Sequence, residues 1–132
     1  MAALLHILEI NRTSSDEIVA TTAHKPEVER AIALFLDALR KEYAVDEVRL
    51  YGSRARSDFR PDSDVDLAVV LPGEHGNIWD VAQTFGDIAY DVLMETGAVV
   101  SALPLWQDDL DHPELAKNPA LMRNIQQEGI RL

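Results

Sequence analysis

Two acidic residues with a spacing suited to chemistry, Asp64 and Asp66, open the apolar stretch Asp64–Leu71. In a β-strand, residues two apart point to the same face, about 7 Å apart along the strand, so both carboxylates converge on one spot. Such a pair repels itself unless a cation lies between the two groups. An all-oxygen site with open positions suits Mg²⁺ or Mn²⁺, with phosphates and water as the remaining ligands. The sequence therefore predicts a metal site at Asp64 and Asp66.

A second element of the same site precedes the aspartates. Gly52-Ser53 follows an alternating stretch, and a glycine at a strand end lets backbone N–H groups approach an anion while the serine hydroxyl donates a further hydrogen bond. The next basic residues are Arg54, Arg56 and Arg60, and guanidinium groups pair well with polyphosphate. Together these residues predict a site that grips a nucleoside triphosphate and bridges it through metal to the Asp pair, as nucleotidyl transfer requires.

Each part of this pattern also has an ordinary interpretation. Gly-Ser after a strand is commonly only a turn, and Asp-x-Asp at a strand start is commonly a solvated loop margin. The arginines could pair with Asp58 and Asp62 for little energy. It is the combination at fixed spacing that favours a nucleotide site.

The elements that position these residues are readable from hydrophobic periodicity. A helix is predicted from Pro26, with an apolar stripe at Val28, Ile32, Phe35 and Leu39. Strands are predicted at 47–51 and 64–71, joined by a loop through Asp62. A second helix at 77–95 ends before Gly97, a third strand spans 98–103, and a last helix spans about 119–128. This order predicts an α/β (α+β) domain, in which a small mixed sheet is flanked by helices.

Composition sets the outer limits. The chain has 132 residues, 47% of them hydrophobic, which favours one domain over 24–132 preceded by an extension of uncertain structure at 1–23. With 23 acidic and 12 basic residues the net charge is -11, so direct DNA binding and membrane binding are not expected. The absence of cysteine and of an apolar span predicts a soluble, cytoplasmic protein.

The stretch from Tyr51 to Leu67 resembles the signature of the minimal nucleotidyltransferases (MNT) of the DNA polymerase beta superfamily. The match is Gly52-Ser53 followed by Asp64-x-Asp66, and it includes the tyrosine before the glycine and the residues Arg54, Arg56 and Ser63. The resemblance implies a small sheet with flanking helices, ATP as the donor, and catalytic metal held by Asp64 and Asp66. It also implies that Gly52, Ser53, Arg54, Arg56 and Ser63 bind the nucleotide.

Many single-domain proteins of this kind are similar to the antitoxin half of HEPN–MNT toxin–antitoxin pairs. There the MNT partner transfers AMP to a tyrosine of the HEPN ribonuclease and silences it, and this activity is our leading hypothesis, with a homo-oligomer left open. One departure counts against catalysis: the superfamily usually has a third carboxylate on the neighbouring strand, where this chain has no acid and Ser101 is the only polar side chain.

Two further functions are therefore carried as hypotheses. The first is a nucleotidyltransferase acting on a small molecule, such as an aminoglycoside hydroxyl. The second is a binding module that covers a HEPN partner without chemistry and tolerates the loss of the third acid. A third carboxylate close enough to share a metal with the Asp pair favours catalysis. The absence of any acid near the pair favours the binding module that covers its partner.

Overall fold

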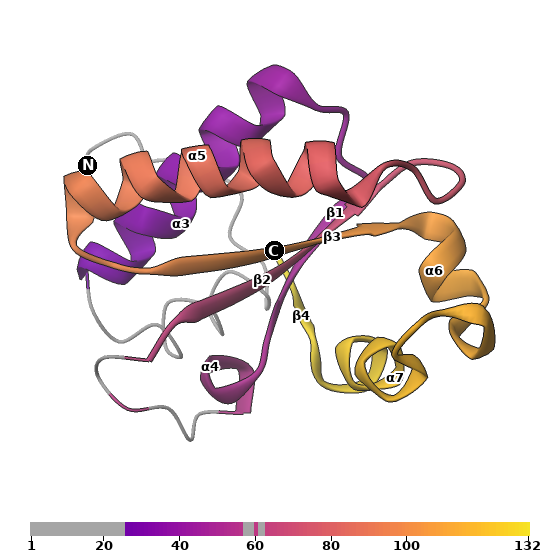
Figure 1. Ribbon diagram of the computed structural model, residues 1–132. Coiled ribbons are helices and arrows are strands. Elements are labelled where there is room, and N and C mark those ends of the chain that lie inside the picture. Colours follow the sequence, from indigo (N-terminus) through magenta and orange to yellow (C-terminus); the bar gives the residue numbers. More distant parts are fainter. Residues whose placement is uncertain (1–25, 57–59, 61–62) are drawn as a thin grey trace.

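In the part of the chain that the structure describes, the sheet has four strands in the order β3-β2-β1-β4, with helices on both of its faces (Figure 1). The computed structural model describes residues 26–56, 60 and 63–132. β1 (Glu47–Tyr51) pairs antiparallel with β2 (Val65–Leu71) and with the short β4 (Ile130–Arg131), while β2 pairs parallel with β3 (Val100–Trp106). This mixed sheet confirms the predicted fold class. The prediction made for residues 1–23 lies outside the described residues.

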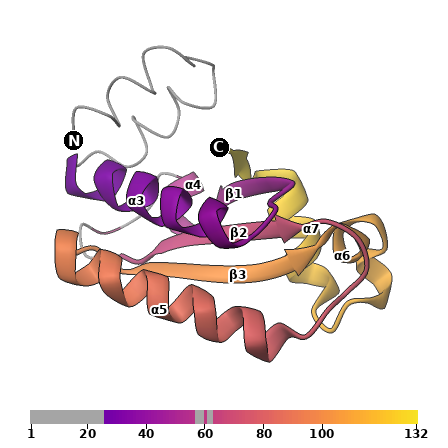
Figure 2. The same ribbon diagram turned by 90° about the horizontal axis from the view of Figure 1, so that it is seen from above.

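Two long helices, α3 (Pro26–Glu42) and α5 (Ile78–Thr96), lie side by side over one face of the sheet (Figure 2). The predicted stripe of α3 is buried, as expected for its helical spacing. The side chain of Asn77 accepts hydrogen bonds from the backbone N–H groups of Trp79 and Asp80, which caps the start of α5. Gly97, with φ 77°, ends that helix in the left-handed conformation.

The opposite face of the sheet carries shorter helices. These are α4 (Ser53–Arg56), α6 (Gln107–Asp111), the 3₁₀ helix η1 (Pro113–Leu115) and α7 (Pro119–Glu128). α4 lies beside β1, and α7 lies over β1 and beside α6 (Figure 1). The last helix matches its predicted bounds, and its first turn is capped by Asn118, which accepts from the N–H of Leu121.

The alternation of β2 divides the core into two clusters. Val65, Leu67, Val69 and Leu71 belong to the cluster beneath α3 and α5, together with Phe35 and Phe85, whose rings pack edge to face. Ala68 and Val70 point the other way and pack with residues of β3, α6 and α7, namely Leu105, Leu110, Met122 and Ile125. β2 is therefore buried on both faces along most of its length, as its continuous apolar end predicts.

Several details differ from the sequence-based expectation. The residues after Gly52 form the single helical turn α4, where a loop was expected. β3 runs over 100–106 instead of 98–103, because it pairs with β2 along its whole length, from Val65↔Val100 to Leu71↔Trp106. β3 therefore continues through Pro104, which is tolerated because β3 is an edge strand. α6, η1 and β4 were not predicted, since none has a periodic apolar pattern of its own.

None of the helices in the described part of the chain is long and apolar enough to cross a membrane.

Candidate active site

The two predicted metal ligands lie together at the start of β2. Asp64 is exposed and Asp66 is half-buried, in register with Tyr51 on β1. Burial raises the pKa of Asp66, and the neighbouring charge of Asp64 raises it further, while Arg54 and Arg56 act in the opposite direction. The carboxylates are thus close enough to repel each other, which is the electrostatic condition that a divalent cation relieves.

The carboxylate of Asp66 leans directly over Gly52. A Cβ added to Gly52 would lie 2.6 Å from Asp66 Oδ2, and the φ of 72° is one that side chains rarely adopt. Glycine is needed here for both reasons. Ser53 follows at once as the first residue of α4. The predicted phosphate-binding residues and the predicted metal ligands therefore meet at one end of the β1–β2 pair.

The tyrosine of the motif is a neutral neighbour of this site. Burial raises the pKa of the Tyr51 phenol, and the charge of Asp66 raises it further. Tyr51 therefore stays protonated at neutral pH, and it packs in part against the cluster beneath α7. It adds no negative charge beside the aspartates.

Arg54 occupies a different position from the one expected of a surface cation. Its side chain is only 2% exposed, and its Nε and Nη2 donate to the backbone carbonyl of Ser63 at 3.3 and 2.9 Å. Burial lowers the pKa of Arg54, whereas the charges of Asp64 and Asp66 raise it. The guanidinium thus ties α4 to the segment that leads into the Asp pair, a contact that no sequence signal reveals, because arginines are seldom buried.

The other predicted residues of this segment, Arg56 and Ser63, are exposed and partly exposed, respectively. Arg56 is exposed and makes a 3.7 Å ion pair with Glu128 of α7, in which both side chains are about half exposed. Ser63 Oγ accepts from the backbone N–H of Arg60 at 2.9 Å, and the N–H of Ser63 donates to the Arg60 carbonyl at 3.0 Å. These bonds join Ser63 to Arg60 just before Asp64. Arg56 and Arg60 are therefore the cations that face solvent here.

The strand beside the Asp pair supplies no third acid. Ser101 is the β3 partner of Asp66 in the register, and it is exposed. Among the described residues, no group of three or more histidines and carboxylates is arranged to hold a metal ion. The donor set present is therefore two carboxylates, from Asp64 immediately before β2 and from Asp66 within it, which fits a divalent cation that completes its coordination with phosphate and water.

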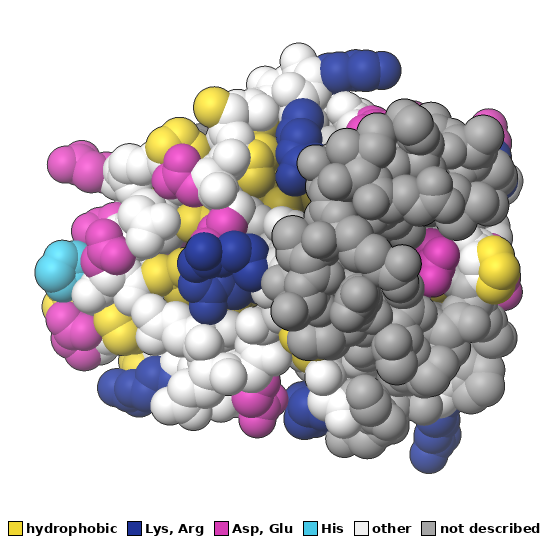
Figure 3. All heavy atoms as spheres, turned by 180° about the vertical axis from the view of Figure 1, so that it is seen from behind, with side chains coloured by type: hydrophobic (Ala, Val, Ile, Leu, Met, Phe, Trp, Pro, Cys, Tyr) yellow, Lys and Arg dark blue, Asp and Glu magenta, His cyan; other side chains and the backbone are white. Residues whose placement is uncertain are grey.

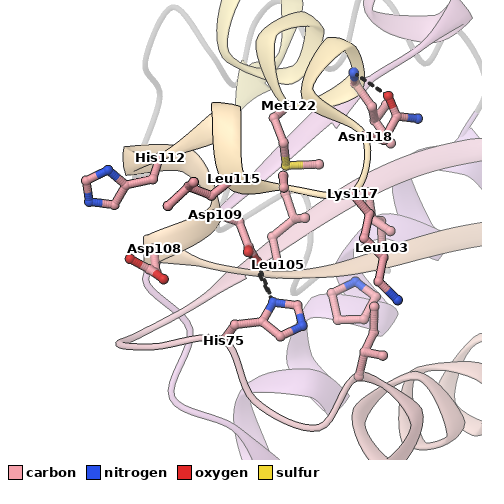
Figure 4. A pocket seen from close by; sticks show the side chains of 14 residues that line it. His75, Leu103, Leu105, Asp108, Asp109, His112, Leu115, Lys117, Asn118 and Met122 are labelled. Atoms are coloured by element: carbon pink, nitrogen blue, oxygen red, sulfur yellow. Dashed lines mark hydrogen bonds and ion pairs between the residues drawn. The ribbon is translucent and has the colours of Figure 1, made fainter.

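A separate hollow of about 420 Å³ lies further along the same side of β3 (Figure 4). Its floor includes Leu103 and Leu105, which alternate with Ser101 on one face of the strand, and residues of η1 and α7 form its walls. Because strand residues rise about 3.3 Å each, Leu103 begins roughly 7 Å from Ser101. The hollow and the Asp pair thus share the face of the sheet that α3 and α5 leave open.

The acidic run before α7 is partly structural. Asp109 accepts from the backbone N–H of Trp106 at 2.9 Å and contacts His75 Nδ1 at 3.1 Å (Figure 4). Asp109 lies within the acidic stretch 108–114, yet its side chain is only 15% exposed. The aspartate caps α6 and fixes the end of β3. It therefore holds one wall of the hollow and does not reach the Asp pair in this arrangement.

The fold matches that of a solved nucleotidyltransferase-type structure. A solved structure described as "a putative nucleotidyltransferase" from Sulfolobus solfataricus is similar to this chain with a TM-score of 0.57 and 17% identity, covering 90% of this chain and 86% of that one. At this identity the likeness concerns the fold alone.

The sequence comparison identifies the family. The model of the nucleotidyltransferase domain family matches residues 32–132, and the chain belongs to that family, within the DNA polymerase beta superfamily. A protein of Methanocaldococcus jannaschii named "putative protein adenylyltransferase" is 27% identical over 103 residues, which covers 76% of this chain and 93% of the relative. The family membership confirms the expected nucleotidyltransferase, whereas the antitoxin role stays a prediction.

Proposed function

We propose that this protein transfers AMP from ATP to a hydroxyl group of another protein, with a divalent cation between Asp64 and Asp66. The observation that carries the proposal is the contact between the Asp66 carboxylate and Gly52. It joins a pair of self-repelling carboxylates to a turn in which Gly52 and Ser53 are both partly exposed. A site of this kind serves a metal-bound triphosphate.

The residues of the chain divide the work between them. Gly52 and Ser53 hold the triphosphate, and Arg56, which faces solvent next to them, neutralises part of its charge. Arg54 is buried and donates to the carbonyl of Ser63, which directly precedes Asp64, so we assign it to positioning the Asp pair. When Mg²⁺ is bound, it neutralises charge that develops on the phosphoryl and leaving oxygens. The two aspartates would hold that cation.

The direction of attack follows from in-line displacement. The leaving pyrophosphate is held on the β1 side of Asp66, at Gly52 and Ser53, so the acceptor hydroxyl approaches from the opposite, β3 side. On that side Ser101 is exposed and carries no charge. A hydroxyl is not a base at neutral pH, so the acceptor proton leaves to solvent or to a group of the partner.

The acceptor we propose is a tyrosine of a HEPN ribonuclease, which would make this chain the antitoxin of a HEPN–MNT pair. Support comes from the relative whose printed name is a protein adenylyltransferase and which this chain matches over nearly its whole length. The surface also fits a protein acceptor better than a nucleic acid. The formal net charge of -11 disfavours a nucleic acid, and in the coloured part of the face seen in Figure 3 a compact group of basic side chains lies among acidic ones.

A second function has its own supporting observation. Because Ser101 stands where a third carboxylate would complete the metal site, the same fold could neutralise a HEPN partner by covering it without transfer. The two functions differ in one respect that can be measured. Transfer depends on the Asp pair, whereas covering does not.

The test is incubation with labelled ATP, Mg²⁺ and the product of the neighbouring gene. We expect label on the partner, loss of labelling by about 10³-fold in Asp64→Asn or Asp66→Asn, and no change in the matched control Asp108→Asn. Full labelling by both Asp variants would overturn the metal assignment. Inhibition of the partner's ribonuclease without labelling, unchanged by Asp66→Asn, would instead establish the covering function.

A further inference from the structure

Helix α5 presents an apolar stripe to solvent along its outer side. Trp79, Tyr90 and Met94 are 82%, 61% and 63% exposed. At 100° per residue, these three side chains fall within an arc of about 60° over the length of the helix. Gln83 falls within this arc and Gly86 lies about 20° outside it, so the stripe carries no charge. Single exposed apolar residues are ordinary, whereas several aligned on one helix mark a docking surface.

The two edges of this α5 stripe differ in character. Asp80, Asp87 and Asp91 project along one edge, and all three are exposed. The other edge is lined by half-buried apolar residues, namely Ala82, Ala89 and Leu93. Figure 2 shows α5 at the border of the described part of the molecule, with α3 on one side only. The surface is therefore an open apolar band with a single acidic edge.

Gly86 adds an independent observation at the middle of the stripe. It lies within a 19-residue helix, where glycine is a poor helix former. A Cβ placed on Gly86 would meet nothing within 4 Å, so no described neighbour requires the missing side chain. A glycine on a helix surface does let the backbone of a second helix approach closely. The space at Gly86 thus fits a contact made outside this chain.

We infer that the α5 stripe docks an amphipathic helix of another protein, with an apolar seam that lies on Trp79, Tyr90 and Met94 and with lysine or arginine along one edge. The basic edge is required because it complements the charge of the three aspartates. This surface lies on the helical layer that covers the far face of the sheet from the Asp pair. The inference is therefore independent of the proposed catalysis.

Charge also argues against two other occupants of the α5 stripe, namely a second copy of this chain and the chain's own first 23 residues. A second copy would bring a further net charge of -11, and an antiparallel pair of α5 helices would place the two aspartate edges side by side. The chain's own first 23 residues contain Arg12 as their one Lys or Arg, against Glu9, Asp16 and Glu17. Neither supplies the basic edge that the aspartates require.

The first experiment uses Trp79 as a reporter in the full chain. Trp106 is 6% exposed, so quenching of tryptophan fluorescence by acrylamide reports mainly on Trp79, which the Trp79→Phe variant verifies. We expect acrylamide to reach and quench Trp79. We also expect sedimentation to show no dimer in which Trp79 is shielded. A shielded Trp79 in the monomer would mean that the stripe is covered by its own chain. A shielded Trp79 in a dimer would mean a second copy, and either result overturns the proposal.

The second experiment supplies the proposed partner chemistry directly. Two synthetic helical peptides share one leucine seam, and their edges carry lysine in one and glutamate in the other. We expect the lysine peptide to bind about tenfold more tightly at low salt, with the difference shrinking as salt screens the charges. Tyr90→Lys should abolish binding, whereas Leu115→Lys, at a still more exposed site outside the stripe, should not. Equal binding of both peptides, or binding of neither, overturns the proposal.

Gly86→Leu separates docking from folding. Leucine favours the helix, so the melting temperature should rise or stay unchanged. The added side chain occupies the space for the partner backbone, and the lysine peptide should bind about tenfold more weakly. Because stability and binding move in opposite directions, misfolding cannot produce this result. Unchanged binding would show that no close backbone approach occurs at Gly86 and would overturn the proposed docking geometry.

Discussion

The two faces of β2 are built from alternate residues of one short strand, yet they do opposite things. Leu67 points toward α3 and α5 and is fully buried, whereas its neighbour Asp66 points to the other face and is half-buried. Ala68 and Val70 share the face of Asp66 but are covered by α7 and its neighbours. The comparison shows that the Asp pair lies where the layer formed by α6 and α7 ends, because that layer covers only part of this face of the sheet.

The largest expected effect is a loss of stability when a side chain on the covered face of β2 is shortened. Leu67→Ala removes a fully buried side chain from the cluster beneath α3 and α5 and should lower the free energy of unfolding by about 2–5 kcal/mol. Chemical denaturation measures this value. Leu115→Ala, at a 79% exposed site, should change it by no more than about 0.5 kcal/mol. Similar losses at both positions would contradict the core described for the covered face.

The second prediction sharpens the contrast between two arginines of the same motif. Arg54→Met leaves the Ser63 carbonyl without its buried donor and should cost about 2–3 kcal/mol of stability, together with weaker ATP binding. Arg56→Met should leave stability within about 0.5 kcal/mol, because its ion pair is exposed, and should weaken ATP binding alone. Denaturation and calorimetry are the two measurements. If Arg54→Met leaves stability unchanged, the positioning role is wrong.

The third prediction concerns the contact between Gly52 and Asp66. Gly52→Ala should destabilise the fold by about 1–3 kcal/mol and impair ATP binding, since the new Cβ meets Oδ2. Gly73→Ala is the matched control. Gly73 also has a positive φ, at 85°, but nothing lies within 4 Å of its Cβ position. The backbone penalty should therefore appear in both variants, and impaired ATP binding only at Gly52.

A fourth prediction tests the missing acid by adding one. Ser101→Asp places a carboxylate on β3 in register with Asp66 and should tighten Mg²⁺ binding about tenfold. Without metal the same variant should be less stable, because a third negative charge joins the pair. Ser101→Asn provides the uncharged control of nearly equal size. Titration of Mg²⁺ followed by melting temperature measures both effects, and identical affinity in the two variants would place Ser101 outside the metal site.

The smallest expected effect is a pH dependence. The folded state holds the proton of Asp66 more tightly than the unfolded chain, where the pKa is near 3.8, because burial and Asp64 raise the folded pKa. The contribution of Asp66 to stability is therefore lost as pH rises from that value through the raised pKa. Melting curves across this range should show a flatter dependence in Asp66→Asn. Leu115→Ala should keep the slope of the unaltered protein.

Much of this arrangement could be predicted from periodicity and turn chemistry. The stripe of α3, the end of α5 before Gly97 and the placement of alternate β2 residues on one face are local patterns, and the described elements match them. The Gly52-Ser53 and Asp64-x-Asp66 motifs likewise indicated one site. Elements of a few residues, such as α4 and β4, escaped prediction because contacts with β1 stabilise them rather than their own sequence.

The sequence by itself determined which residue types are available: two aspartates on one strand face, a glycine where positive φ is required, and no acid on β3. Only the tertiary structure decided that Asp66 leans on Gly52 and that Arg54 turns inward to Ser63 while Arg56 stays in solvent. The physical reason is that local preferences act over a few residues along the chain. Burial and charge proximity depend on segments that meet only after folding.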